Sequence, residues 1–542
     1  GPSLASQIPN SHVDYRQYLP DPVCTSLFLS PTREIEVCDI VSSFKNNKAA
    51  GFDDFSSDVV KSIIGQISKP LAHIFNLSLS KGKFPNKLKI AKVTPVFKKG
   101  DKTESSNYRP ISVLSVFSKI LERIVYSRTY TFLEKNDILF NGQYGFRKNF
   151  STSMALIDIS NRIVNAFEND CFVMGIFIDL SKAFDTINHD ILLSKLHNYG
   201  IRGIAHDWFS SYLSNRQQCT KVKNSQSHLQ KITCGVPQGS LLGPLLFILY
   251  INDLCKSSNI LSFILYADDT SILYCDKNID NLYSVVNEHL IKVCEWFKTN
   301  KLSVNALKCN YIVFRSTPRP LDLSNFQILL NDNVIPRVEF TKFLGVLIDN
   351  RLTWKNHISQ IQHKIAKNIG IISKLSSFLP KTILRILYCS LVLPYLSYCN
   401  VVWCNTYQSN LTKLHTLQKK IIRILSAAAP LAHTDPLFHT LKLLKLSDIN
   451  LLQQCNIIYR CTKKLLPPQF CNLFQLNSNI HGHNTRSSGL LHILEHKKSS
   501  FQYNIQYTGP KYWNNLSIEL KEQPSVHCFM LKLKARLLTS KL

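Results

Sequence analysis

Three aspartates stand where a metal-dependent phosphoryl transfer could be carried out. Asp179 ends an apolar run that begins at Cys171, and Asp268 and Asp269 lie between two alternating apolar runs within 263–274. Two divalent ions about 4 Å apart can stabilise both the attacking and the leaving oxygen of a phosphoryl displacement. Mg²⁺ prefers hard oxygen ligands such as carboxylates. An Asp-Asp pair at a turn is by itself far more often structural than metal-binding, so other features must support this interpretation.

The aspartates need rigid elements to bring them together. The pattern predicts a short buried strand over 171–179 and a hairpin over 263–274, with Asp268 and Asp269 at its bend. Apolar residues at helical spacing predict a helix over 187–199, and Gly200 is placed to end it. If the strand and the hairpin are neighbours in one sheet, the three carboxylates converge on a shared pair of ions.

The composition describes a globular protein with a strong excess of positive charge. Hydrophobic residues make up 45% of the 542 residues, and 64 Lys and Arg against 36 Asp and Glu give a net charge of +28. The length allows three or four packed subdomains, and the charge favours a polyanionic partner such as nucleic acid. A merely solvated basic surface is the alternative that charge alone leaves open.

The cysteines, the apolar runs and the first residues bear on where the protein works. The 16 cysteines include no Cys-x-x-Cys pair, which favours reduced thiols in an intracellular protein. The longest apolar run, 241–251, is too short to span a bilayer, so we expect no membrane partner. Gly1, Pro2 and Ser3 are typical of a tag-cleavage scar, which suggests that the chain is a piece of a longer polypeptide.

Beyond residue 350 the pattern becomes helical. Apolar stripes run along two expected helices, within 358–372 and 411–425. Rows of lysines, including Lys364 and Lys367, share other faces of these helices. Each row is either a nucleic-acid contact or an ordinary solvated face.

Several segments together resemble reverse transcriptases. They occur in that family's order: 107–111 (NYRPI), 143–148 (QYGFRK), 177–185 (FIDLSKAFD), 235–240 (GVPQGS) and 266–269 (YADD). The first two are similar to segments of non-LTR, LINE-type retrotransposons, and 509–516 (GPKYWNNL) is similar to the jockey-like branch. The resemblance covers roughly 34–540, and motifs in this number and order make coincidence negligible.

The resemblance implies roles for single residues. Asp179, Asp268 and Asp269 would hold two Mg²⁺ ions, which Mn²⁺ could replace, with Leu180 as a further metal contact. Phe184 matches the ring that excludes a ribose 2′-hydroxyl, although without the motif it would be a plain core aromatic. The remaining implied positions fall into three groups. They are the nucleotide-binding residues Lys98 or Lys99, Arg109, Gln238 and Gly239; the acid Lys308, for which an exposed surface lysine is the alternative; and the template or primer contacts Arg147, Phe343, Leu344, Gly345, Lys364 and Lys367.

The expected fold is α+β, a right-hand polymerase with an added C-terminal domain. We expect an N-terminal extension (1–45), fingers (46–170), an antiparallel palm with the primer grip and some interleaved finger segments (171–350), a helical thumb (351–430) and a C-terminal nucleic-acid-binding domain (431–542). The resemblance implies an RNA-directed DNA polymerase of a non-LTR retrotransposon, acting in target-primed reverse transcription.

Its implied partners are element RNA, a DNA primer or target, deoxynucleoside triphosphates and an endonuclease domain in the full polypeptide. The setting would be the nucleus during integration and the cytoplasm during assembly with RNA. Two alternatives stay open: a catalytically silent, domesticated scaffold, and an RNA-copying RNA polymerase, which Phe184 disfavours.

Overall fold

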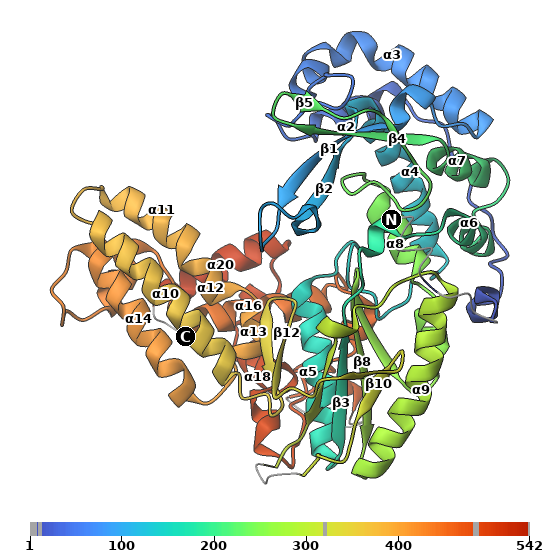
Figure 1. Ribbon diagram of the computed structural model, residues 1–542. Helices are drawn as coiled ribbons and strands as arrows, with labels where there is room; N and C mark the ends of the chain where they lie inside the picture. The colour runs from blue at the N-terminus through green and yellow to red at the C-terminus, as the bar shows by residue number, and fades with distance from the viewer. Residues whose placement is uncertain (1–7, 9–12, 318–321, 481–486, 540–542) are drawn as a thin grey trace.

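The computed structural model describes residue 8 and residues 13–317, 322–480 and 487–539 (Figure 1). Gly1, Pro2 and Ser3, where the sequence suggested a scar, lie outside this range. Helices and several small sheets make up a mixed α+β protein. All 16 cysteines are free. None of the helices in the described ranges is long and apolar enough to cross a membrane.

A four-stranded antiparallel sheet stands at the centre of the molecule. Its strands, in the spatial order β7-β8-β3-β9, are β7 (Ser262–Tyr266), β8 (Asp269–Asp276), β3 (Phe172–Ile178) and β9 (Asn310–Phe314). Side chains alternate between the faces of a strand, and β3 shows this clearly: Met174, Ile176 and Ile178 enter one hydrophobic core, while Val173 and Phe177 enter a second. The sheet is therefore buried on both faces, which fixes its register.

One helix covers each face of this sheet. α9 (Ile279–Thr299) packs on the face of the first core, and α5 (Thr152–Glu168) packs on the second, as Figure 1 shows. Both helices begin at capping side chains: Asn278 accepts from main-chain N–H groups of α9, and Ser151 accepts from Met154 N of α5. The sheet is thus held rigid between two capped helices.

A second sheet of five strands lies above the first in Figure 1. Strand β1 pairs with β2 and, in parallel, with β4, which also pairs with β5 and β6. The strands are β1 (Ile90–Phe97), β2 (Tyr108–Val113), β4 (Arg216–Val222), β5 (Ser225–Gln226) and β6 (Gln230–Ile232). The helices of this part of the chain are α2 (Glu34–Ser42), α3 (Ser57–Lys81), α4 (Val116–Lys135), α6 (His189–Asn198), α7 (Ile204–Leu213) and α8 (Gly243–Tyr250).

Two hairpins lead from the four-stranded sheet into a helical region. They are β10 (Ile328–Leu330) with β11 (Asn333–Ile335), and β12 (Phe340–Phe343) with β13 (Val346–Asp349). The helices that follow are α10 (Lys355–Leu375), α11 (Lys381–Leu391), α12 (Leu393–Ser397), α13 (Asn400–Trp403) and α14 (Gln408–Ser426). The predicted apolar stripes of α10 and α14 are buried, and the two helices pack on each other.

The last part of the chain is helical and shares the second hydrophobic core. Its helices are α15 (Asp435–Leu441), α16 (Leu446–Thr462), α17 (Pro468–Cys471), α18 (Ile505–Asn514), α19 (Ile518–Lys521) and α20 (Val526–Leu538). α16 contacts α18, α20 and α13, and the 3-10 helix η8 (Ser499–Tyr503) contacts α5. Since α5, α10 and α16 contribute to one core, residues 431–539 do not form an isolated unit.

Two segments pack on a different sheet from their neighbours in the sequence. α5 lies within the expected finger segment 46–170, but it packs on β3 and β7 of the four-stranded sheet. Strands β4 to β6 belong to the five-stranded sheet and lie within 171–350, where some interleaved finger segments were expected. Strand pairing and packing between distant segments decide both assignments, and neither leaves a local pattern in the sequence.

Candidate active site

Strand register brings Asp179 beside the Asp268–Asp269 bend. β3 pairs with β8 through Ile178 opposite Thr270, so the next residues on the two strands, Asp179 and Asp269, are neighbours. The main chain after β3 is also held, because Asn305 N donates to Asp179 O at 2.9 Å. Leu180, which follows, forms an isolated bridge with Val304, and its side chain is buried. The site therefore lies at one end of a rigid sheet.

A second segment supports the bend from behind. Gln143 Oε1 accepts from Ala267 N at 3.1 Å and from Gly145 N at 2.8 Å. Ala267 has a φ of +56°, a left-handed conformation that a non-glycine residue adopts at some cost. A Cβ on Gly145 would lie 2.3 Å from Ala267 N, so no other residue fits without moving the bend. The segment 142–145 therefore holds the two aspartates in place.

The acids interact strongly with one another. Burial, together with the charge of Asp179, raises the pKa of Asp268. Burial and the charges of Asp268 and Asp179 raise the pKa of Asp269 to about 6. Asp179 Oδ2 is 3.1 Å from Lys308 Nζ, and this ion pair is half-exposed. Negative charge at the site thus exceeds what the neighbouring protein cations neutralise.

This donor set fits divalent magnesium. Mg²⁺ takes one or two carboxylates and completes its shell with water and substrate phosphates. Within the described residues no three His, Cys, Asp or Glu side chains already form a metal-binding group. The Asp179 carboxylate is turned towards Lys308 instead. The excess charge on Asp268 and Asp269 is what a divalent cation would relieve.

Two cations of the five-stranded sheet act on this site. The positive charges of Arg109 and Lys98 lower the pKa of Asp268, against the larger effect of burial. Both residues lie at the end of the β1–β2 pair, where Lys98 N donates to Asn107 O at 2.9 Å, and both are exposed. Lys99, the other candidate, is also exposed.

Phe184 lies at the edge of an aromatic group. Its ring stacks on that of Phe247, with the ring centroids 4.5 Å apart, and meets the Phe146 ring edge-on at a centroid distance of 6.1 Å. The residue is only partly buried, whereas Phe247 is fully buried. Phe184 is therefore fixed from behind, with part of its surface open.

The segment with Gln238 and Gly239 joins Phe184 to the five-stranded sheet. Gln238 Nε2 donates to Asp185 Oδ1 at 2.8 Å, and Gln238 O accepts from Ser112 N of β2 at 2.7 Å. Gly239 has a φ of +129°, and a Cβ there would lie 2.4 Å from Ser112 O. Glycine is needed at this point because the two main chains approach so closely.

Arg147 is held by contacts with other protein groups. Its side chain is 5% exposed, pairs with Glu134 at 3.1 Å and lies over the Phe150 ring at 4.2 Å. A contact of Arg147 with template or nucleotide stays a prediction, while in the structure Glu134 accepts its charge. The positive charge is used to hold α4 against the segment that follows it, a contact that the QYGFRK motif alone does not reveal.

The remaining expected contacts lie on β12–β13 and α10. Phe343 is buried against Phe177 at 5.7 Å, so it anchors the hairpin to the sheet. Leu344 and Gly345 form the turn with positive φ values, and Leu344 O accepts from Tyr398 Oη at 2.7 Å. Lys364 and Lys367 are exposed on α10, and Lys364 Nζ lies over the Tyr395 ring.

Sequence reasoning missed a chain of contacts behind the bend. Gln469 of α17 donates through Nε2 to Tyr144 Oη at 2.9 Å and to Asn141 O at 3.0 Å. Tyr144 N donates to Leu265 O at 2.7 Å, one residue before the Tyr266–Ala267 step. The QYGFRK motif signalled Gln143 and Tyr144 as part of the family pattern without a role, and nothing in the sequence signalled Gln469.

Comparisons with known proteins agree with this geometry. Residues 97–348 match the family model "Reverse transcriptase (RNA-dependent DNA polymerase)", a range that includes all three aspartates. The chain is 29% identical over 445 residues to "RNA-directed DNA polymerase from mobile element jockey" of Drosophila melanogaster. This alignment covers 80% of this chain and 48% of that protein.

Two further relatives from the same fly are similar. One is "Probable RNA-directed DNA polymerase from transposon BS", 29% identical over 425 residues, with 75% of this chain and 46% of that protein covered. The other is "Probable RNA-directed DNA polymerase from transposon X-element", 26% identical over 438 residues, with 78% and 47% covered. The chain spans about half the length of these relatives. With Asp179 and the Asp268–Asp269 bend at one end of a single sheet, the chain is similar to reverse transcriptases, and among them to those of the non-LTR elements jockey, BS and X-element.

Proposed function

We propose that the chain is an RNA-directed DNA polymerase that extends a DNA primer on an RNA template with the help of two metal ions. The observation that carries the proposal is the position of Asp179 beside Asp268 and Asp269, whose mutual repulsion a divalent cation would relieve. Its match to the reverse transcriptase family model supports the same reaction. Bound Mg²⁺ would supply stabilisation for the charge that develops on the reacting phosphate.

The parts of the molecule take the roles of a right hand in this proposal. The four-stranded sheet with α5 and α9 is the palm, and the five-stranded sheet with its helices forms the fingers. The β12–β13 hairpin is the primer grip, α10 to α14 form the thumb, and 431–542 is a further nucleic-acid-binding region. Figure 1 supports this division, because the β1–β2 end points down towards the palm and α10 to α14 stand to one side of it.

Each site residue then has a task that matches its surroundings. Asp179, Asp268 and the main chain of Leu180 hold the metal ions, and Asp269 adds charge. Arg109 and Lys98 bind the triphosphate, Arg in a bidentate manner and Lys as a point charge. Gln238 and Gly239 lie along the new base pair.

Lys308 would have two partners in turn, one before the reaction and one during it. In the structure it pairs with Asp179. During the reaction it would transfer this interaction to the departing pyrophosphate and donate a proton to it. Because the pair is half-exposed, exchanging one anion for another costs little.

The nucleic acid would be held without sequence readout. The turn at Leu344 and Gly345 holds the primer end, and Lys364 and Lys367 follow backbone phosphates, which binds any sequence. In a full-length element the primer would come from a separate endonuclease domain, so the reaction would be target-primed reverse transcription.

The test is extension of a DNA primer on an RNA template with both deoxy- and ribonucleotides offered. We expect Mg²⁺-dependent addition of deoxynucleotides alone. Phe184→Ala should admit ribonucleotides, because the ring would no longer fill the space of the 2′-hydroxyl. Absence of extension by the wild-type protein, with primer–template binding intact, would instead support a silent scaffold, and ribonucleotide addition by the wild type would support an RNA polymerase.

A further inference from the structure

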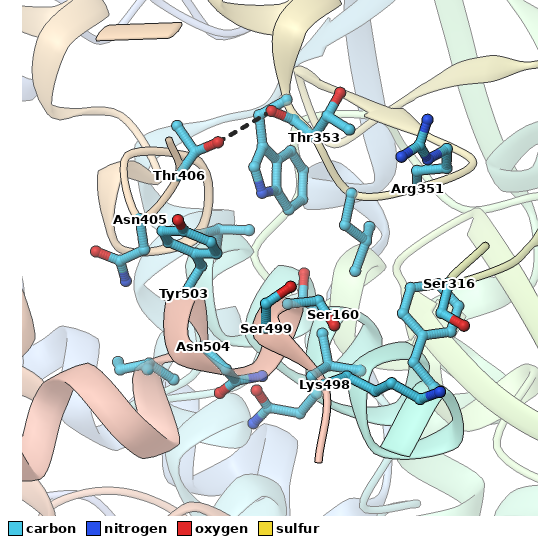
Figure 2. Close-up of a pocket in the computed structure, with 18 of the residues that line it drawn as sticks. Ser160, Ser316, Arg351, Thr353, Asn405, Thr406, Lys498, Ser499, Tyr503 and Asn504 are labelled. Carbon is cyan, nitrogen blue, oxygen red and sulfur yellow. Dashed lines mark hydrogen bonds between the residues drawn. The ribbon is translucent and has the colours of Figure 1, made fainter. Parts of the chain in front are cut away.

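A cavity of about 270 Å³ lies apart from the aspartates, where five segments meet (Figure 2). Its walls come from α5, the loop after β9, the β13–α10 turn, the α13–α14 loop and η8. None of Asp179, Asp268 and Asp269 lines it. No proposed step of the polymerase reaction uses this cavity.

The charge of the lining has one sign. It includes Arg351 and Lys498 but no Asp or Glu. In Figure 2 both cations lie on the right-hand side of the cavity, with Ser316 between them. Lys498 pairs with Asp170 at 2.5 Å, outside the lining, whereas the Arg351 guanidinium makes no ion pair with any described residue. This end of the cavity is suited to an anion.

The walls also hold hydrogen-bonding groups without partners. Ser160 Oγ, Asn161 Nδ2 and Ser500 Oγ are buried, and no protein atom in the described structure satisfies them. All three residues line the cavity. A hydroxyl turns easily about χ1, so a polar ligand in the cavity could satisfy these groups.

The other end of the cavity is aromatic. The rings of Tyr407 and Tyr503 lie 4.9 Å apart, and Tyr407 is 49% exposed. Figure 2 places Tyr503 on the left, beside Asn405 and Thr406 and opposite the cations. A ligand that combines a flat ring with a phosphate would therefore meet matching groups at both ends.

We infer that this cavity binds one nucleotide unit of a single-stranded nucleic acid, with its base on the tyrosines and its phosphate at Arg351 and Lys498. The volume suits one nucleotide rather than a helix, and a base can enter only where it is not stacked in a duplex. The net charge of +28 provides the general attraction for such a strand. RNA and DNA share the recognised chemistry, so either can be the source.

Photo-crosslinking of the full chain tests the placement directly. Short single-stranded RNA and DNA oligonucleotides with a photoreactive uracil are bound and irradiated, and the modified peptides are identified. We expect crosslinks at Tyr407 or Tyr503. The oligonucleotide that gives the stronger crosslink, RNA or DNA, identifies the type of strand that the cavity binds. Crosslinks confined to α10, α14 or the aspartate site would overturn the inference.

Two variants test the energetics. Arg351→Ala and Tyr407→Ala should each weaken single-strand binding about fivefold or more. Arg351→Ala should also reduce the slope of log affinity against log salt concentration by about one released counterion. Tyr407→Ala should leave this slope unchanged. Both should extend a primer–template with a template overhang of only a few nucleotides as the wild type does, since neither residue belongs to the polymerase site.

Exposed residues outside the cavity serve as matched controls. Lys381→Ala removes a charge from α11, and Phe378→Ala removes an aromatic ring that is 82% exposed. If these controls weaken single-strand binding as much as the cavity variants, binding is diffuse and the inference fails. The inference also fails if extension of the short-overhang primer–template falls together with single-strand binding, because the cavity would then serve the duplex.

Discussion

Two groups of carboxylates show how the same side chain serves different ends in this protein. Asp253 is fully buried, but Lys195 lies 2.6 Å away and is enclosed by the Tyr250 and Trp296 rings. Asp268 and Asp269 instead feel the negative charge of Asp179, and Asp269 also that of Asp268, against a weaker influence of Arg109 and Lys98 on Asp268. The charges of the first arrangement are matched within the protein, whereas the second has an excess of negative charge that a cation would relieve.

The comparison teaches how to separate structural from functional acids. A matched ion pair joins α6 to the segment after α8, and its loss should affect stability. Unmatched acids reduce stability, and the metal binding proposed above would give this protein a reason to keep them. Each prediction below tests one side of this contrast.

The largest effect should come from Asp268→Asn. Losing a metal-binding carboxylate removes several kcal/mol of transition-state stabilisation, so primer extension should fall about a thousandfold or more. Thermal unfolding and primer–template binding should stay near those of the wild type. Asp253→Asn is the matched control and should behave in the opposite way, with lower stability and normal turnover per folded molecule. Retained extension by Asp268→Asn would refute the metal assignment.

Lys195→Met should destabilise the protein by about 3–5 kcal/mol, because it leaves the buried carboxylate of Asp253 without a partner. Denaturant unfolding measures this change. The double variant Lys195→Met with Asp253→Leu should recover most of the loss, since neither charge remains. A loss of unfolding free energy below about 1 kcal/mol would show that water compensates the lone carboxylate of Asp253. This pair would then no longer serve as an example of acids that stabilise the fold.

Gln469→Leu should lower kcat about fivefold with an unchanged KM for nucleotides, because it weakens the support of the bend through Tyr144. Steady-state extension kinetics separate the two constants. Tyr144→Phe should have a similar effect, and the double variant should be little worse than either single one. Lys532→Ala, which breaks an exposed pair with Glu519 in the same region, is the control and should change nothing. If the effects of the two single substitutions on kcat simply add in the double variant, Gln469 does not act through Tyr144.

The smallest effect concerns the stability of the metal-free protein. The pKa of Asp269 is about 6 in the folded state, above the value of about 3.9 in unfolded chains, so its charge opposes folding above pH 6 and not below pH 4. Asp269→Asn should therefore stabilise the metal-free protein at pH 8 by about 1 kcal/mol, a value reduced because solvent also reaches this carboxylate, which lies low in a recess but keeps an exposed surface. Unfolding at both pH values measures it, and equal stabilisation at pH 4 would contradict the prediction.

Much of the site could be predicted from the sequence because its parts are local. The apolar run before Asp179 predicts a strand, the alternation around 268–269 predicts a hairpin, and both form as β3 and β7–β8. The buried stripes of α10 and α14 were equally readable from their spacing. In each case the pattern and the structure share one period, 2.0 residues for strands and 3.6 for helices.

The sequence by itself determined which residues could perform the chemistry, since the residue types and their order are written in the chain. Only the tertiary structure decided that Arg147 turns inward to Glu134, that α5 packs on the four-stranded sheet and that Gln469 supports Tyr144. Gln469 and Tyr144 are 325 residues apart, and no periodicity or composition connects such positions. These contacts depend on the packing of the whole molecule, because shape and distance in space select them.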